Sequence, residues 1–198
     1  MKTIVALTFF AIVTFVATAK KVEYGGGTCH NSEVGAMVNF DPKTFFSGTW
    51  YLTYATQSTR VTLSTICRNF NPKVNDDGTI EVTYEYYENG GSDNLYSVTC
   101  TGNKEQSGGG VFNFKCNSKN GRGEVGDFNI DVSFLATDYN TYGIVYRCVK
   151  TDLLTEDNVF LIHRQLNPNE EEVNKILKPY ELTLDKFISR KDATCTNK

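Results

Sequence analysis

The stretch "GTWYLTY", Gly48–Tyr54, contains the one tryptophan of the chain, Trp50. This tryptophan stands two residues after a glycine, at the head of the first run whose residues alternate as in a strand. A glycine at such a position lets the backbone turn tightly and approach a neighbouring side chain closely. The position of Trp50 at the head of this run is therefore a clue to the fold of the strands that follow.

Eight short runs of this kind follow one another, and clusters of Gly, Asn and Asp separate them. Short turns without intervening helices predict an all-β domain, either an up-and-down barrel or a sandwich. The predicted strands span residues 49–58, 64–71, 79–88, 94–101, 110–116, 124–136, 141–149 and 158–166.

The alternation within these runs assigns the two faces of the predicted sheet. One face of "TIEVTYEYY" carries apolar and aromatic side chains, namely Ile80, Val82, Tyr84 and Tyr86. One face of "GDFNIDVSF" does the same with Phe128, Ile130, Val132 and Phe134. Because a slip of one residue would turn the apolar set toward water, this pattern predicts the inward face.

One helix is predicted, after the last strand. Asn167 is a candidate N-cap with Pro168 at the first helical position, and the glutamates at 170–172 favour the positive end of a helix dipole. An apolar stripe follows at helical spacing, formed by Val173, Ile176, Leu177 and Tyr180. The stripe predicts a C-terminal α-helix packed on the outside of the β domain.

The first residues have the pattern of a signal peptide. Lys2 precedes the apolar run Ile4–Val16, and Ala17-Thr18-Ala19 is a small-residue cleavage site. The run is shorter than the roughly 20 residues that a membrane span needs. The sequence therefore predicts a signal peptide over 1–19 and a secreted single domain over 20–198.

The charge of the chain argues against nucleic acid as a partner. The formal net charge is −3, and no basic run is present. A nucleic-acid-binding protein needs a stripe of Lys and Arg to neutralise phosphates, so this class of function is excluded.

The cysteines predict a disulfide-bonded extracellular protein. All six lie after the signal peptide: Cys29, Cys67, Cys100, Cys116, Cys148 and Cys195. Six cysteines allow about 15 connectivities, so the count alone leaves the pairing open. Cys100 and Cys116 lie on the apolar faces of two runs that a Gly-rich turn joins, so hairpin geometry favours this pair.

Three short motifs in this order resemble the lipocalin family. They are Gly48-x-Trp50 at the first strand, Thr137-Asp138-Tyr139 between the sixth and seventh, and Arg164 in the last strand. The resemblance implies an eight-stranded antiparallel up-and-down barrel of the calycin type, with the C-terminal helix on its outside. It also implies that Trp50 closes one end and that Arg164 packs across it, a cation–π contact worth about 0.5–2 kcal/mol. Gly48, Trp50, Asp138 and Arg164 are thus the predicted scaffold residues.

Longer stretches resemble the triabin-like salivary lipocalins of blood-feeding triatomine bugs, the pallidipin, triplatin and triafestin group, with the nitrophorins as more distant relatives. They are "NFDPKTFFSGTWYLTYAT", "ATDYNTYGIVYRC", "EDNVFLIHRQL" and "FISRKDATC". This resemblance implies the disulfides Cys29–Cys148, Cys67–Cys195 and Cys100–Cys116.

Catalysis, metal and haem find no support in the sequence. No G-x-S-x-G, P-loop or HExxH motif occurs, and His163 is the one histidine within a predicted strand. The nitrophorin resemblance would place a haem ligand in "TIEVTYEYYE", which contains no histidine. We therefore expect no enzyme activity, no cofactor and no metal.

A ligand pocket inside the barrel is the remaining site. Leu52 and Phe134 are predicted to face inward together with the candidate ligand-binding residues Tyr54, Tyr84, Tyr86, Tyr96, Phe112, Phe128, Tyr142, Tyr146 and His163. These side chains either fill the core or line a pocket, and so many tyrosine hydroxyls favour a pocket because each needs a partner.

The charged residues predicted in and near the barrel indicate which class of ligand to expect. Arg60 and Arg68 are predicted near the barrel mouth, either solvated at the surface or in contact with a carboxylate or phosphate. No carboxylate is predicted to face inward and pair with an ammonium group. These observations favour an eicosanoid such as thromboxane over ADP or a biogenic amine.

The resemblance implies a monomeric salivary protein that impairs host haemostasis. The first expectation is inhibition of platelet aggregation by sequestering a small lipid-like or amphipathic host mediator. The alternative is a triabin-like or triafestin-like protein that uses its outer surface to inhibit a host coagulation or contact-phase protein of the kallikrein–kinin system. Fold alone does not separate the two.

Overall fold

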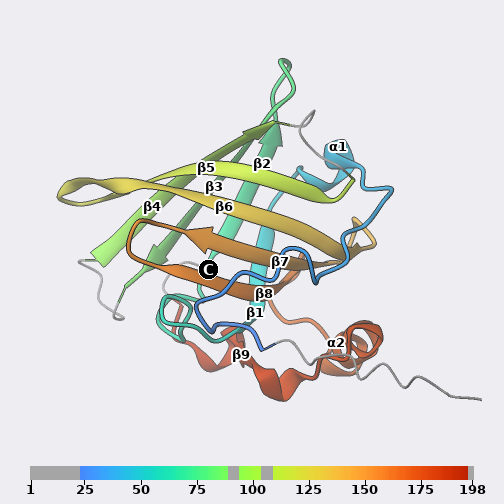
Figure 1. The fold of residues 1–198 in the computed structure, drawn as a ribbon. Helices are drawn as coiled ribbons and strands as arrows, with labels where there is room; N and C mark the ends of the chain where they lie inside the picture. The colour runs from blue at the N-terminus through green and yellow to red at the C-terminus, as the bar shows by residue number, and fades with distance from the viewer. Residues whose placement is uncertain (1–22, 89–93, 104–108, 196–198) are drawn as a thin grey trace, which may run out of the picture.

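Within the described residues, 23–88, 94–103 and 109–195, the computed structural model contains eight antiparallel strands that close into a barrel (Figure 1). Each strand pairs with its neighbour in sequence, and β1 pairs with both β2 and β8, so the sheet closes. The up-and-down barrel is therefore confirmed over the sandwich; the predicted signal peptide lies outside the described residues. The strands are β1 (Trp50–Thr56), β2 (Asn69–Val74), β3 (Thr79–Tyr87), β4 (Leu95–Asn103), β5 (Val111–Asn120), β6 (Gly123–Thr137), β7 (Tyr142–Lys150) and β8 (Thr155–His163).

Strands β3 to β6 follow the predicted alternation. Cys100 in β4 stands beside Val82 in β3 and Cys116 in β5, and Cys116 stands beside Phe128 in β6. All four belong to the core cluster that fills the barrel. The period-two pattern therefore placed the inner face of these strands correctly.

Strand β2 starts five residues later than predicted. Residues 57–68 form a loop instead, and β2 includes Pro72. The pairing of β2 with β1 covers only Trp50–Phe70 and Tyr51–Asn69, so Pro72 lies where that edge of β2 is unpaired. A missing N–H costs no ladder bond at such a position.

The C-terminal helix α2 spans Glu170–Leu177, and a 3-10 turn, η3 (Lys178–Tyr180), continues it. Its N-cap is Asn169 and not the predicted Asn167, since the Asn169 side chain accepts from the N–H groups of Glu171 and Glu172. Val173 and Leu177 are buried against outward-facing residues of the barrel wall, as the stripe predicted. No helix in the described part of the chain is long and apolar enough to cross a membrane.

The segments before and after the barrel are fixed to its outside. A short helix, α1 (Pro42–Phe45), precedes β1, and the last segment forms η4 (Leu184–Lys186), β9 (Phe187–Ser189), which pairs with β1, and η5 (Arg190–Asp192). Cys29–Cys148 ties the N-terminal segment to β7, and Cys67–Cys195 ties the 57–68 loop to the C-terminal segment. Together with Cys100–Cys116, all three predicted disulfides are confirmed.

Candidate ligand-binding site

The closed end of the barrel is built around Trp50. The indole is 1% exposed, its Nε1 donates to the carbonyl of Phe45 at 3.0 Å, and the Arg164 guanidinium lies over its ring at 3.5 Å from the centroid. Arg164 also donates to the carbonyls of Ser47 and Thr49, which fixes the turn before β1. This is the arrangement that the sequence motifs predicted.

Asp138 and Gly48 complete this end. The Asp138 carboxylate accepts from the backbone N–H groups of Asn140, Thr141 and Tyr142 and so closes the β6–β7 turn. Burial would raise the pKa of Asp138, but hydrogen bonds from the Thr141 hydroxyl and from these N–H groups hold it below its ordinary value. Gly48 has φ +59°, where a residue with a Cβ is strained.

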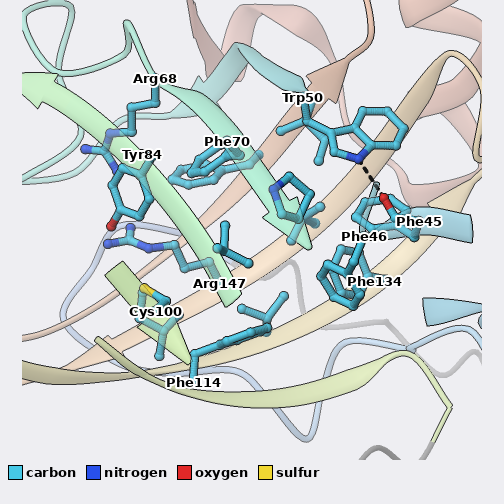
Figure 2. Close-up of a pocket in the computed structure, with 17 residues that line it drawn as sticks. Phe45, Phe46, Trp50, Arg68, Phe70, Tyr84, Cys100, Phe114, Phe134 and Arg147 are labelled. Atoms are coloured by element: carbon cyan, nitrogen blue, oxygen red, sulfur yellow. Dashed lines mark hydrogen bonds between the residues drawn. The ribbon is translucent and has the colours of Figure 1, made fainter. Parts of the chain in front are cut away.

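An apolar cavity of about 100 Å³ lies above this floor (Figure 2). Phe45, Phe46, Trp50 and Phe134 line one end of it, and Phe70, Val82, Cys100, Phe114, Ile130, Val145, Phe160 and Ile162 are among the side chains around it. Phe45 stacks on Trp50 with ring centroids 4.7 Å apart. The barrel is thus packed with aromatic rings at its floor and hollow above them.

Two buried arginines lie at the other end of the cavity, beside Tyr84 (Figure 2). Arg68 is 3% exposed and Arg147 is 8% exposed. The Arg68 guanidinium lies 4.8 Å from the ring centroid of Tyr86 and 5.8 Å from that of Tyr84, and that of Arg147 lies 5.2 Å from the Phe160 ring. Two buried guanidinium groups therefore lie beside this end of the cavity, whose own walls are apolar.

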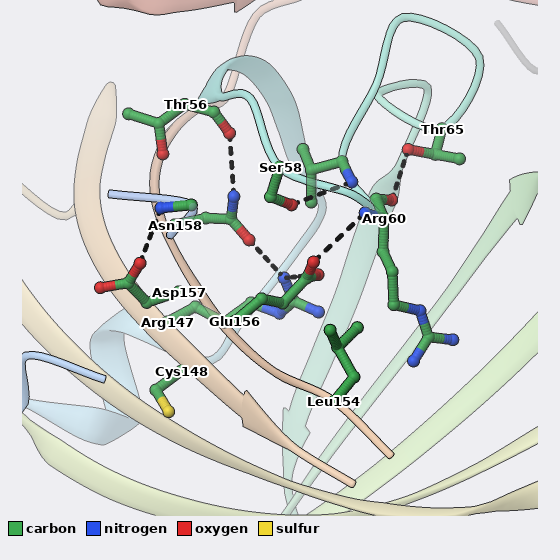
Figure 3. Close-up of polar contacts among 12 residues, drawn as sticks. Thr56, Ser58, Arg60, Thr65, Arg147, Cys148, Leu154, Glu156, Asp157 and Asn158 are labelled. Atoms are coloured by element: carbon green, nitrogen blue, oxygen red, sulfur yellow. Dashed lines mark hydrogen bonds and ion pairs between the residues drawn. The ribbon is translucent and has the colours of Figure 1, made fainter. Parts of the chain in front are cut away.

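Polar contacts hold both arginines in place. Arg68 Nε donates to the carbonyl of Thr65 at 2.8 Å, which joins it to the 57–68 loop. Arg147 donates to Asn158 Oδ1 at 2.9 Å and lies 4.0 Å from Glu156 (Figure 3). The other oxygen of Glu156 accepts from the N–H of Arg60 at 3.2 Å, so one carboxylate connects β8, β7 and the loop.

The charges at this end do not balance. Glu156 is 1% exposed and is the one buried carboxylate beside the two buried guanidinium groups in the described part of the chain. Arg60 and Glu88, both partly exposed and of opposite charge, line the narrow gap beyond the arginines. Burial lowers the pKa of Arg68, and burial together with Arg68 lowers that of Arg147 to about 10. Guanidinium groups stay protonated in proteins, so both carry a positive charge at neutral pH. One buried positive charge is therefore left without a partner.

Four predicted pocket residues lie outside the barrel. Tyr54 was predicted inward because it shares parity with Trp50 and Leu52, but the β1–β8 register shifts between Leu52 and Tyr54. This bulge turns Tyr54 outward into the cluster beneath α2, whereas Leu52 stays inside. The prediction for Tyr54 was wrong for this reason.

The same correction applies to Tyr142, Tyr146 and His163. Strands β7 and β8 are buried on both faces, because α2 and the N-terminal segment cover their outer side, so alternation does not show which face is inward. Tyr146 donates to Asp157 and accepts from the backbone N–H of His30 in the N-terminal segment. Burial and the nearby Asp157 carboxylate raise the pKa of Tyr146 well above its ordinary value.

The remaining predicted residues do lie inside. Tyr84 lines the cavity, Tyr86 and Phe128 line the gap beyond the arginines, and Tyr96 stacks on Tyr86 at 5.2 Å. Phe112 is 1% exposed and packs among the rings of the floor rather than at the cavity.

Sequence reasoning missed Arg147 and the inward carboxylate of Glu156. A signal for Arg147 was available. Cys148 bonds to Cys29 in a segment that runs outside the barrel, so the neighbours of Cys148 in β7 point inward.

A metal site is not present in the part of the chain that the structure describes, since no three His, Cys, Asp or Glu side chains gather there. The candidate site is an apolar cavity with two buried guanidinium groups at one end, an arrangement typical of a ligand pocket.

Comparison with known proteins identifies the family. The family model described as Triabin matches residues 21–173. The chain belongs to the triabin family. Triabin-family lipocalins are binding and inhibitor proteins and not enzymes.

Relatives align over almost the whole of this triabin-family chain. Triafestin-2 of Triatoma infestans is 32% identical over 97% of this chain and 92% of that protein, and triafestin-1 of the same species is 33% identical with the same coverage. The platelet inhibitor triplatin-2, also of Triatoma infestans, is 26% identical over 98% of this chain and 100% of that protein.

Solved structures share the fold. The tryptamine complex of the amine binding protein of Rhodnius prolixus has a TM-score of 0.67 at 20% identity and covers 80% of this chain and 84% of its own. A mutant of LTBP1 in complex with leukotriene C4 has a TM-score of 0.59 at 23% identity and covers 88% and 99%. Such neighbours share the barrel fold of this triabin-family chain.

Proposed function

We propose that this secreted triabin-family protein binds an amphipathic acid, with an eicosanoid such as thromboxane as the leading candidate. The unbalanced buried charge of Arg68 and Arg147 carries the proposal. An unpaired cation in an apolar interior is costly, and an anionic ligand removes that cost. A carboxylate between two guanidinium groups can accept several charge-assisted hydrogen bonds.

The apolar part of the ligand has its place in the cavity. The walls next to the arginines are phenylalanine, valine and isoleucine side chains, which suit a hydrocarbon chain. A volume of about 100 Å³ is below the roughly 300–1,000 Å³ of typical ligand pockets. A whole eicosanoid must therefore move aromatic side chains or the 57–68 loop when it enters.

Amines and nucleotides fit this end less well. Glu156, the carboxylate that an ammonium group would need, already faces Arg147 and the N–H of Arg60. ADP would bring phosphates to the arginines but would bury a polar ribose and adenine among phenylalanines.

Impairment of platelet aggregation follows if the bound mediator is a platelet agonist. The names of relatives support this step, since one is a platelet inhibitor and one structural neighbour holds leukotriene C4. Another neighbour holds tryptamine, so the class of ligand needs a direct test.

Titration calorimetry of the disulfide-bonded protein with a thromboxane mimetic, serotonin and ADP is that test. We expect heat of binding with the acid and none with serotonin. Binding of serotonin alone would overturn the assignment. A platelet-aggregation assay with a thromboxane mimetic as agonist should then show inhibition that excess agonist overcomes.

Surface inhibition of a coagulation or contact-phase protein is the second candidate. The small volume of the cavity favours it, because a barrel that stays packed cannot sequester an eicosanoid. Contact-activated clotting times, measured beside platelet aggregation, separate the two. Prolonged clotting with a normal platelet response would favour this candidate.

A further inference from the structure

The narrow gap beyond the buried arginines differs from the cavity below it in the groups that line it. Its lining is mainly polar, whereas the walls of the cavity are apolar. Its volume is about 10 Å³, close to the roughly 10–15 Å³ that one water molecule needs. The gap therefore suits one small polar species and not a hydrocarbon chain. The polar residues around it are Arg60, Arg68, Tyr84, Tyr86, Glu88 and Arg147.

Both buried guanidinium groups have N–H donors that the protein leaves unused. Arg68 donates through Nε to the carbonyl of Thr65 and through Nη2 to that of Arg60. Arg147 donates through Nη1 to Asn158. Among the described residues, Arg68 Nη1 and Arg147 Nη2 have no hydrogen-bond partner, yet neither atom is sealed off from open space. The cavity below exposes almost no polar surface, so these donors face the gap.

Two tyrosine hydroxyls reach the same gap. Tyr84 and Tyr86 stack with ring centroids 6.3 Å apart, and the guanidinium of Arg68 lies over both rings. Figure 2 shows the Tyr84 hydroxyl turned toward the guanidinium of Arg147. Neither hydroxyl has a partner in the part of the chain that the structure describes, and neither is sealed off from open space. Burial raises the pKa of Tyr86, so its hydroxyl keeps its proton and can donate.

The charges around the gap favour an anion over a water molecule. Arg60, Arg68 and Arg147 are positive, and Glu88 and Glu156 are negative, so one positive charge is in excess. A water molecule donates as well as accepts, whereas the groups left without partners at this gap are donors. An anion accepts from all of them through charge-assisted hydrogen bonds and supplies the missing negative charge.

We propose that this gap is a binding site for one monatomic anion such as chloride, held by Arg68, Arg147 and the hydroxyls of Tyr84 and Tyr86. The ion neutralises the excess charge while the barrel holds no acid. When an acid enters, its carboxylate takes the place of the ion, a step that rests on the acid site proposed above.

The 35Cl NMR line width of chloride, titrated against the disulfide-bonded protein, tests the site. Gluconate, which is too large for the gap, replaces chloride so that the ionic strength stays fixed. We expect a saturable broadening of the chloride line, and an anomalous-scattering peak between the two guanidinium groups in crystals grown in bromide. Absence of saturable broadening, or bromide peaks at exposed side chains alone, would mean an adventitious ion only and would overturn the proposal.

Three variants separate binding from folding. Tyr84→Phe removes one donor and keeps the ring, so chloride should bind about threefold to tenfold more weakly. Tyr96→Phe is its matched control and should have no effect, because Tyr96 stacks on Tyr86 but does not line the gap. Glu88→Gln removes a repelling charge at the partly exposed edge of the gap and should strengthen binding by about twofold. Equal affinity of the wild type, Tyr84→Phe and Glu88→Gln would contradict the site.

The exchange of ion for acid has its own measurement. The thromboxane mimetic should bind more weakly in chloride than in gluconate at the same ionic strength, and Tyr84→Phe should reduce this difference. Equal affinity in the two salts would refute the exchange. If the mimetic does not bind in either salt, the acid site fails, while the chloride titration still decides whether the anion site exists.

Discussion

Gly48, Trp50 and Arg164 form a close contact at the turn before β1. Gly48 has φ +59°, and a Cβ built there would lie 3.3 Å from Arg164 Nη1. The guanidinium is held between this glycine and the indole, which it covers at 3.5 Å. The backbone conformation therefore favours glycine, and a Cβ at this position would also crowd the guanidinium.

Gly48→Ala should lower the free energy of unfolding by about 1–2 kcal/mol, because alanine is strained at positive φ and pushes Arg164 off the ring. Urea unfolding monitored by the fluorescence of Trp50 measures the change. Gly121→Ala, at a glycine without positive φ and with open space around it, is the control and should have little effect. Equal losses in the two variants would contradict this role of Gly48.

His163 should make the protein less stable in mild acid. Its pKa is about 4 when folded and about 6.5 when unfolded, so between these values the unfolded chain binds a proton that the folded protein does not. Stability therefore falls as pH decreases from about 6.5 to about 4, by about 3 kcal/mol from this residue. His163→Asn should lose that much less over this range in urea unfolding at stepped pH, and identical pH profiles would refute the assignment.

At the scale of elements, the N-cap of α2 is Asn169 and not Asn167, which the following Pro168 had suggested. Asn169 accepts from the N–H groups of Glu171 and Glu172, whereas Asn167 lies in the preceding connection. Asn169→Ala should cost about 1 kcal/mol of unfolding free energy. Asn167→Ala should cost much less, and the reverse order would restore the cap predicted from sequence.

The strands and the inner faces of β3 to β6 could be predicted from sequence, because these strands have one solvent-exposed face and one buried face. Alternation of Tyr84 and Glu85 is visible without a structure. Strands β7 and β8 are buried on both faces, so alternation does not show which of Tyr146 and Arg147 points into the barrel. The bulge that turns Tyr54 outward arises from pairing with β8, a contact between residues over a hundred positions apart, and leaves no local trace in the sequence.

At the scale of the whole molecule, the end of the barrel opposite Trp50 contains one more buried positive charge than buried negative charge. Glu156 is the one buried carboxylate beside Arg68 and Arg147 in the described residues, and it also anchors the 57–68 loop. Removing the charge of Glu156 should therefore lower the stability of the protein and strengthen its binding of an acid.

Glu156→Gln should lower the free energy of unfolding by about 3 kcal/mol, because two buried cations then lack a counter-charge. The same variant should bind the thromboxane mimetic more tightly than the wild type, and its melting temperature should rise more on addition of the acid. Calorimetry gives both quantities. Glu85→Gln on the outer face of β3, where Glu85 accepts from Ser97, is the control. Weaker acid binding by Glu156→Gln would contradict the charge balance described here.

Whether the buried guanidinium groups bind the acid is decided most directly by titrating the thromboxane mimetic into Arg68→Gln and Arg147→Gln, with Arg122→Gln at an exposed turn as the matched control. Loss of either buried arginine should weaken binding by about tenfold or more, and loss of Arg122 should change it by less than about twofold. Unchanged affinity in both buried-arginine variants, when each is folded, would contradict an acid site inside the barrel.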